Sequence, residues 1–121
     1  MWVYQQSTGV LSHDLSYVAE GYSGHGEGKN RPEFQEIADV GPIPVGSWTI
    51  TGPPQDTPSH GPCVLRLTPS AETDTYGRSG FLLHGDSVVD PGAASMGCIV
   101  LPRPVREAIW ESGDRDLTVT P

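Results

Sequence analysis

Short runs of strand-forming residues, each bounded by Gly, Pro, Asp or Ser, constrain the fold of this chain more than any other feature. Fifteen Gly and twelve Pro among 121 residues supply many turns, and they follow no collagen-like period. A sequence so rich in turn residues favours short strands. We therefore predict a mainly β fold with strands at residues 2–6, 15–19, 47–51, 64–68, 80–83, 98–101 and 117–120.

One short helix is expected near the C-terminus. Pro104 suits a first helical position, and Gly113 can end the helix in the left-handed conformation. Between them, Val105, Ala108 and Ile109 share a face at helical spacing. This face would pack against the sheet.

Two segments, residues 21–32 and 52–62, are rich in Gly, Pro and polar residues. Both are too long for hairpin turns, so we expect them to form surface loops near a functional site. At 12.9 kDa the chain fits one domain, residues 1–121, and we expect a single site.

Charge and hydropathy argue against several classes of function. With only seven Lys and Arg and a formal net charge of −8, the chain lacks the basic face that nucleic-acid binding needs. No stretch approaches the ~20 apolar residues of a membrane-spanning helix, and the first residues lack the basic and then apolar pattern of a secretory signal. We expect no nucleic-acid partner, no transmembrane segment and no signal peptide.

The region from residue 78 to residue 100 contains the parts of a thiol active site, which are a nucleophile, a base and donors for an oxyanion. His84 ends one apolar run and precedes Gly85, while Cys98 follows Gly97 at the start of another. If the two runs are neighbouring strands, thiol and imidazole meet at one end of the sheet, and the amides of Gly97 and Cys98 can form an oxyanion hole. From spacing alone, a turn glycine before a core cysteine is equally consistent.

The other cysteine and the remaining histidines suggest less specific roles. Cys63 opens an alternating run and is typical of a buried core cysteine. His13, His25, His60 and His84 could in principle bind a metal, as in a metal hydrolase, but none has a compact ligand spacing such as His-x-x-x-His. We expect no metal and no other cofactor.

Several motifs together resemble a known family. Residues 80–86 (Gly-Phe-Leu-Leu-His-Gly-Asp) and 95–99 (Ser-Met-Gly-Cys-Ile) resemble the His-Gly and Ser-x-Gly-Cys signature of the L,D-transpeptidase catalytic domain. Residues 41–50 (Gly-Pro-Ile-Pro-Val-Gly-Ser-Trp-Thr-Ile) are similar to the family's Thr-Pro-x-Gly-aromatic-x-Ile strand entry. Gly-Tyr-Ser-Gly at 21–24 and Arg-Ser-Gly-Phe at 78–81 are closer to its compact branch of type VI secretion effectors.

The resemblance implies a small β-sandwich or barrel and an acyl-enzyme reaction on peptidoglycan stem peptides, between diaminopimelate and the terminal D-alanine. It implies Cys98 as nucleophile and His84 as base, with the carbonyl of Gly85 orienting the imidazole. The acyl-enzyme would then pass to water, as in an L,D-carboxypeptidase, or to an amine, as in an L,D-transpeptidase or a D-amino acid exchange. Residue types alone leave these outcomes open.

Five residues are candidate substrate contacts. Arg78 is the best cation for bidentate binding of a stem carboxylate, with a solvated turn arginine as the alternative. Asp86 would receive the ammonium of diaminopimelate or cap a turn. Ser95 would contact substrate or only order its loop, and Tyr22 and Ser23 are expected on a loop over the cleft.

The chain departs from the larger family at Met96, where His or Tyr is usual, and at Val100, where Arg or Asn is common.

Partners and location also follow from the resemblance. The resemblance implies delivery by a secretion machine into a neighbouring cell's periplasm and a partner immunity protein; a phage lysis enzyme and an excised domain are the alternatives. The alternative function is a non-catalytic peptidoglycan-binding β domain, which would use the same cleft without an active thiol.

Overall fold

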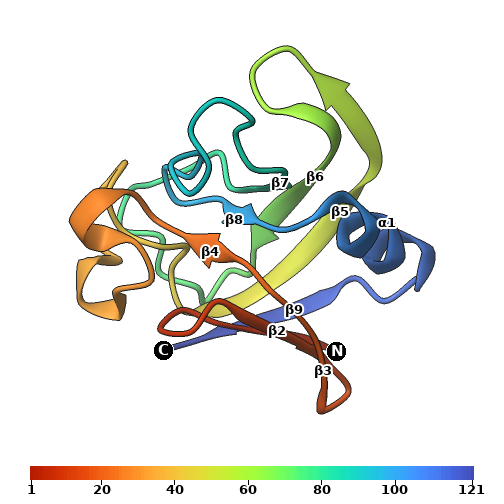
Figure 1. Ribbon diagram of the computed structural model, residues 1–121. Helices are drawn as coiled ribbons and strands as arrows, with labels where there is room; N and C mark the ends of the chain where they lie inside the picture. The colour runs from red at the N-terminus through yellow and green to blue at the C-terminus, as the bar shows by residue number, and fades with distance from the viewer.

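A computed structural model describes residues 1–121 and shows one mixed β-sheet with a single α-helix (Figure 1). The helix, α1, spans Arg103–Glu111, and two short 3₁₀ turns, η1 and η2, span Gly26–Gly28 and Pro32–Phe34. The sheet is nearly closed like a barrel, so the prediction of a mainly β fold with one short helix near the C-terminus is confirmed. Its nine strands are β1 (Trp2–Gln5), β2 (Val10–His13), β3 (Ser16–Glu20), β4 (Tyr22–Ser23), β5 (Gly46–Thr57), β6 (Gly61–Pro69), β7 (Leu82–His84), β8 (Ile99–Val100) and β9 (Asp116–Thr120).

The strands follow the order β3-β2-β1-β9-β5-β6-β7-β8-β4 across the sheet. Inward-facing side chains alternate along the longer strands, as Trp2 and Tyr4 do in β1 and Trp48 and Ile50 do in β5. They belong to one cluster of 16 buried apolar residues. This core lies inside the curl of the sheet.

Residues 52–62 do not form the expected surface loop. Strand β5 continues to Thr57 and β6 begins at Gly61, so the segment is the end of a long hairpin (Figure 1). Strand pairing shifts register between Thr51 and Gln55, and a bulge of this kind accommodates the two prolines without requiring their missing amide donors. The hairpin therefore carries its turn well beyond the regular part of the sheet.

The strand predicted at residues 15–19 begins one residue later, and β2 was not predicted. Asp14 and Leu15 adopt φ angles of 48° and 72°, and His13 pairs with Ser16 across them. Two consecutive positive φ angles define the tight hairpin turn that suits strand twist. Because neither residue is glycine, the sequence did not reveal this turn.

Helix α1 closes one side of the barrel. Pro104 lies in its first turn and Gly113 follows its end with φ of 76°, as predicted. The buried face differs from the prediction, because Arg106 is buried beside Ile109 while Ala108 is exposed. The helix packs closely on β5, where a Cβ at Gly52 would lie 2.5 Å from the Trp110 ring.

Candidate active site

Strands β7 and β8 are parallel neighbours, with Leu83 opposite Ile99 and His84 opposite Val100. Leu83 and Ile99 point into the core. Because side chains alternate between the two faces of a strand, His84 and the residue preceding Ile99, Cys98, lie on the opposite face. Thiol and imidazole thus share one face of the sheet, offset diagonally along it, and do not meet at a common strand end as the sequence suggested.

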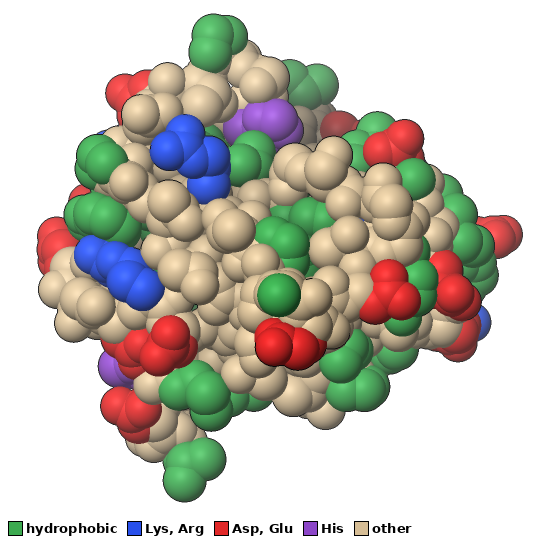
Figure 2. Space-filling model, turned by 180° about the vertical axis from the view of Figure 1, so that it is seen from behind, with side chains coloured by type: hydrophobic (Ala, Val, Ile, Leu, Met, Phe, Trp, Pro, Cys, Tyr) green, Lys and Arg blue, Asp and Glu red, His purple; other side chains and the backbone are tan.

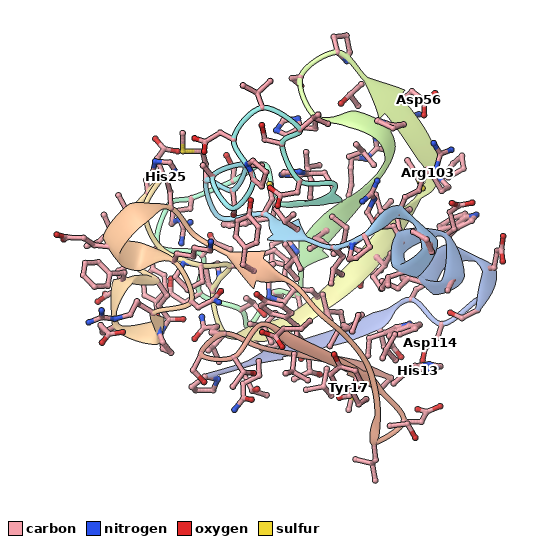
Figure 3. The ribbon with its side chains drawn as sticks, in the orientation of Figure 1. His13, Tyr17, His25, Asp56, Arg103 and Asp114 are labelled. Atoms are coloured by element: carbon pink, nitrogen blue, oxygen red, sulfur yellow. The ribbon has the colours of Figure 1, made fainter.

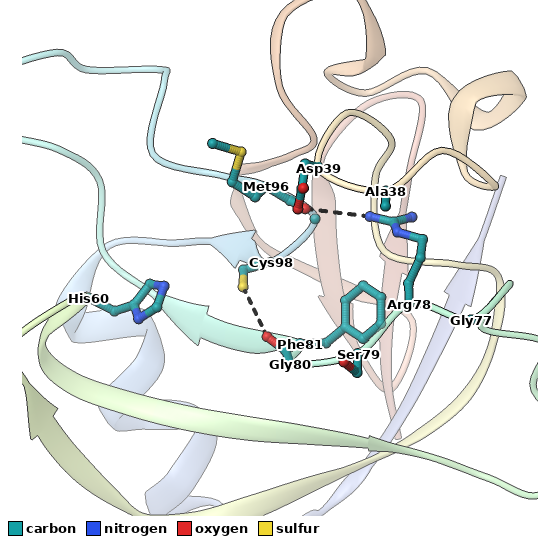
Figure 4. A pocket seen from close by; sticks show the side chains of 11 residues that line it. Ala38, Asp39, His60, Gly77, Arg78, Ser79, Gly80, Phe81, Met96 and Cys98 are labelled. Atoms are coloured by element: carbon teal, nitrogen blue, oxygen red, sulfur yellow. Dashed lines mark hydrogen bonds between the residues drawn. The ribbon is translucent and has the colours of Figure 1, made fainter.

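Cys98 lies at the edge of a cleft of about 350 Å³ (Figure 4). The residue is 7% exposed, and its sulfur donates a hydrogen bond to the Gly80 carbonyl at 3.7 Å. It forms no disulfide with Cys63, which is also buried and free. The remaining lining residues of the cleft are Ala38, Asp39, His60, Gly77, Arg78, Ser79, Phe81, Met96 and Gly97.

The His84 imidazole is buried and has one hydrogen bond. Its Nδ1 donates to the Gly85 carbonyl at 2.8 Å, since a carbonyl oxygen can only accept. In the neutral imidazole Nε2 is then the unprotonated nitrogen, and it is buried without a hydrogen-bond partner. The bond to Gly85 thus selects the neutral tautomer whose Nε2 is a free acceptor, which is the form that a general base requires.

Burial affects the thiol and the imidazole in opposite directions. It raises the pKa of the Cys98 thiol, and a hydrogen bond from the Leu82 backbone and the charge of Arg78 offset only part of this effect. It lowers the pKa of His84, against the bond to Gly85, which favours the charged form. Both shifts favour a neutral thiol beside a neutral imidazole over a thiolate–imidazolium pair.

The loop before Cys98 is fixed by two buried serines. This corrects the prediction that Ser23 lies over the cleft, and for Ser95 it favours loop ordering over substrate contact. Ser95 and Ser23 are both 0% exposed, so neither can contact a substrate. Ser95 Oγ donates to the Cys98 carbonyl at 2.6 Å and accepts from the Gly97 amide at 3.1 Å. Ser23 Oγ donates to the Gly97 carbonyl at 3.1 Å and accepts from the Ile43 amide at 2.9 Å. Of the two amides expected in the oxyanion hole, that of Gly97 is thus already engaged.

Arg78 is 8% exposed, so it is not a solvated turn residue. Its guanidinium is also not free to bind a carboxylate. Its Nη1 donates to the carbonyls of Gln35 and Pro42 at 2.6 and 2.8 Å. Its Nη2 donates to the carbonyls of Gly41 and Met96 at 2.9 and 3.5 Å. A bidentate carboxylate contact would require breaking these bonds. The guanidinium instead joins residues 35–42 to the loop that precedes Cys98.

Gly97 is a glycine because Arg78 approaches it closely. The residue has φ of 125°, and a Cβ there would lie 2.3 Å from Arg78 Nη2. Any side chain would therefore displace the guanidinium and strain the backbone. This explains the glycine by packing, whereas the sequence suggested close approach of a substrate.

Tyr22 and Asp86 fasten the loop that follows His84. Tyr22 lies in strand β4 and is 8% exposed, so it is not on a loop over the cleft. Its hydroxyl donates to Asp86 Oδ1 at 2.6 Å and accepts from the Ala94 amide at 2.8 Å. Burial disfavours ionisation of Asp86, but bonds from Tyr22, Gly92 and Ser87 outweigh it and hold the carboxyl pKa below its usual value. Asp86 thus caps a turn, while its side chain also lines a cleft next to His84.

Sequence reasoning named His60 only as a possible metal ligand and did not place it at this site. It lies in the turn of the β5–β6 hairpin, and its ring centroid is 4.9 Å from that of His84. His60 lines the Cys98 cleft and also a neighbouring cleft of about 450 Å³ that His84 lines. A His within a segment taken for a loop was the only available signal.

A family model described as the Tlde1 domain matches residues 17–118, which include every site residue described above. The chain belongs to the Tlde1 domain family. This is a family of type VI secretion effectors of the L,D-transpeptidase type. Neither the curated proteins nor the solved structures contain a match to the chain.

His60 and His84 lie together, whereas the other two histidines of this Tlde1 domain lie elsewhere. His13 lies beside Asp114, while His25 lies far from both (Figure 3). The cluster with metal-ligand geometry is His13, Asp14 and Asp114, and the Met1 amino group already donates to both carboxylates. This arrangement gives no support to a metal centre at Cys98 and His84.

The surface of the Tlde1 domain reflects its acidic composition. From behind, acidic side chains are scattered over the surface and basic ones appear in few places (Figure 2). Met96 is 57% exposed at the Cys98 cleft, whereas Val100 is buried in β8 and lines a different cleft. Helix α1 has nine residues, and no helix is long and apolar enough to cross a membrane.

Proposed function

We propose that this chain is a cysteine acyltransferase that acts on peptidoglycan stem peptides through a Cys98 acyl-enzyme. The observation that carries the proposal is the pair formed by a buried neutral imidazole with an unpartnered Nε2 and a thiol on the same face of β7–β8, at the edge of a cleft. Membership of the Tlde1 domain family supports the same chemistry. The reaction is that of an L,D-transpeptidase, an L,D-carboxypeptidase or both.

In the first step, the thiol turns from the Gly80 carbonyl towards His84, and Nε2 accepts its proton as sulfur attacks. The attacked carbonyl is that of diaminopimelate in a tetrapeptide stem. Collapse of the tetrahedral intermediate breaks the bond to D-alanine, whose amine takes the proton from the imidazolium. A thioester to Cys98 remains. Catalytic hydrogen bonds of this kind often tighten only when substrate is bound.

In the second step, the neutral His84 accepts a proton from the incoming nucleophile as it attacks the thioester carbonyl. The bond to the Cys98 sulfur then breaks, and the sulfur takes the proton back from the imidazolium. Water gives a shortened stem, and an amine gives a cross-link or an exchanged D-amino acid. The Gly85 carbonyl keeps Nδ1 protonated throughout, so Nε2 is the nitrogen that gains and loses the proton. The carbonyl stabilises the imidazolium without a carboxylate partner.

Substrate recognition combines a cation near the thiol and an anion near the imidazole. Arg78 lines the Cys98 cleft and contributes its positive charge there, although its hydrogen bonds go to the backbone. Asp86 lines the cleft next to His84 and would receive the ammonium of diaminopimelate. The protein would act in a target cell's periplasm after delivery by a secretion system, and an immunity protein would protect the producer.

Incubation with purified muropeptides, followed by mass analysis of stem lengths and linkages, tests the proposal. Wild-type protein and Cys63→Ala should convert tetrapeptide stems, while Cys98→Ala and His84→Ala should not, with melting curves showing that all four are folded. Asp86→Ala should retain more activity than His84→Ala, because a carbonyl and not a carboxylate orients the imidazole. Binding of peptidoglycan with no change in any stem would support a non-catalytic binding domain instead.

A further inference from the structure

The turn of the β5–β6 hairpin presents one side chain to both halves of the proposed catalytic pair. His60 lines the cleft that contains Cys98, and it also lines the cleft that contains His84. No other residue lines both of these clefts. In Figure 4 its ring lies across the cleft from Arg78, with Cys98 between them in that view.

Local contacts fix the orientation of His60. Its amide donates to Thr57 Oγ1 at 2.9 Å, which closes the turn, and its Nδ1 lies 2.8 Å from Ser59 Oγ. Its ring is tilted by 48° against that of His84. These bonds occupy Nδ1 and leave Nε2 of His60 free, while the ring itself covers part of the His84 imidazole.

The His84 imidazole gains its chemical properties from what surrounds it. The groups that face it are His60 from the hairpin, Arg106 from α1, Asp86 after β7 and Cys98 before β8. Burial is the largest cause of its lowered pKa, and the charges of His60 and Arg106 add to this effect, while Asp86 opposes it. Arg106 is buried and bonded to three carbonyls, so His60, which is half-exposed, is the covering group that can be removed with least damage to the fold.

We propose that His60 is a positioning residue that acts through His84: its ring covers the imidazole in the cleft and keeps it the neutral, Nε2-accepting base that Cys98 needs. The inference rests on the proposed function for its catalytic meaning. What it states physically is that the His60 ring changes the protonation of the His84 imidazole. The hairpin extends beyond the regular sheet to bring this ring to the site.

The direct test is an NMR titration of the His84 imidazole in wild-type protein and in His60→Ala, His60→Gln and His25→Ala. In wild type, His84 should titrate below the ordinary histidine pKa of about 6.5. His60→Ala should move the titration upward, because water reaches the ring and a neighbouring charge is lost. His60→Gln should shift it less, because the amide still covers the ring. His25→Ala removes an exposed imidazole elsewhere and should change nothing.

The pH profile of stem-peptide turnover should change in the same order. A lowered pKa means that His84 is a neutral base down to a lower pH, so the acid limb in wild type lies below that of His60→Ala. At a pH on that limb, His60→Ala should be several-fold slower than wild type, and the difference should shrink towards the plateau. A folded His60→Ala with an unchanged His84 titration would overturn the inference. So would loss of all activity at every pH, because His60 would then be the base itself.

The titration separates this inference from the proposed function, since it needs no substrate. If no stem peptide is converted but His84 shifts as predicted, the effect of His60 on His84 is supported and the acyltransferase proposal fails. If stems are converted by a Cys98 enzyme whose His84 titrates identically with and without His60, the reverse holds.

Discussion

The two sides of the sheet are held together by different interactions. Strands β1, β9, β5 and β6 have four to twelve residues each and face a continuous apolar core. Strands β7, β8 and β4, which carry the site, have only two or three residues. Strands this short make too few backbone hydrogen bonds to fix the long loops that connect them. Buried polar side chains fix these loops by hydrogen bonding to their backbone groups.

Two buried arginines bond to backbone carbonyls in this way. Arg78 joins carbonyls on one side of Cys98, and Arg106 donates to the carbonyls of Cys63, Leu101 and Pro62 on the other side of the short strands. Their fork of donors satisfies carbonyls that no strand reaches. We therefore expect substitutions in the apolar core to lower stability most. Substitutions of the buried polar side chains around the short strands should lower activity more than stability.

Truncation of a core residue should have the largest effect on stability. Leu65 in β6 is 0% exposed and pairs with Leu83 of β7. Leu65→Ala leaves a cavity and should lower the free energy of unfolding by about 3 kcal/mol, as measured by urea denaturation. A loss below about 1 kcal/mol would show that the core collapses around the gap. The apolar side of the sheet would then not depend on its core more than the polar side does.

Arg78→Ala should lower both turnover and stability. Four carbonyls lose their donor, so we expect a loss of roughly 2 kcal/mol and a drop in turnover of more than tenfold. Arg78→Lys should not restore activity, because an ammonium lacks the planar fork. The rate of Cys98 alkylation by a small neutral reagent should change as well, because the loop before the thiol moves. Loss of turnover with unchanged alkylation and stability would instead support carboxylate recognition by Arg78.

Gly97→Ala isolates the contact between the loop and Arg78. The added Cβ would lie 2.3 Å from the guanidinium, whereas a Cβ at Gly26, which also has positive φ, meets nothing within 4 Å. Turnover should therefore fall sharply in Gly97→Ala and remain near wild type in Gly26→Ala, with both proteins folded by circular dichroism. Equal activity in the two variants would remove the explanation of Gly97 by packing.

Tyr22→Phe should have the smallest effect. It removes the hydroxyl that joins Asp86 to Ala94, at a cost of about 1 kcal/mol. Hydrogen exchange in residues 86–94 should speed up more than in the core strands. Tyr17→Phe is the matched control, because Tyr17 is 67% exposed. Unchanged exchange in Tyr22→Phe would show that the loop is fixed by other contacts.

The sequence predicted the apolar side of the molecule better than the polar side. The runs at 47–51, 64–68 and 117–120 all lie within strands, because alternation and burial coincide there. The hairpin at 52–62 was missed because two prolines next to a glycine are typical of loops. The register shift that accommodates these prolines depends on how β5 pairs with β6, and the sequence of β5 alone does not indicate it.

The roles of Arg78 and Ser23 could not be predicted for a related reason, and for Ser95 loop ordering was one of two alternatives that the sequence left open. Each was recognised as a residue near the site, but its partners are mostly main-chain groups of distant segments, such as residues 35–42 for Arg78. Backbone groups leave no pattern in a sequence. Cys98 and His84 were singled out because each lies in a short piece of the family's two-part motif, whereas His60 comes close to His84 only through the fold.

The central claim is that Cys98 carries the acyl group, and mass spectrometry of the intact protein tests it directly. Cys63→Ala, which keeps Cys98 as the only thiol, would be mixed briefly with a tetrapeptide stem and quenched in acid. We predict an added mass equal to that of the tetrapeptide minus that of free D-alanine, which is the tripeptide less one water, located at Cys98 by peptide mapping. Cys98→Ala should show no adduct and no turnover. Conversion of the stem by folded Cys98→Ala would contradict the account.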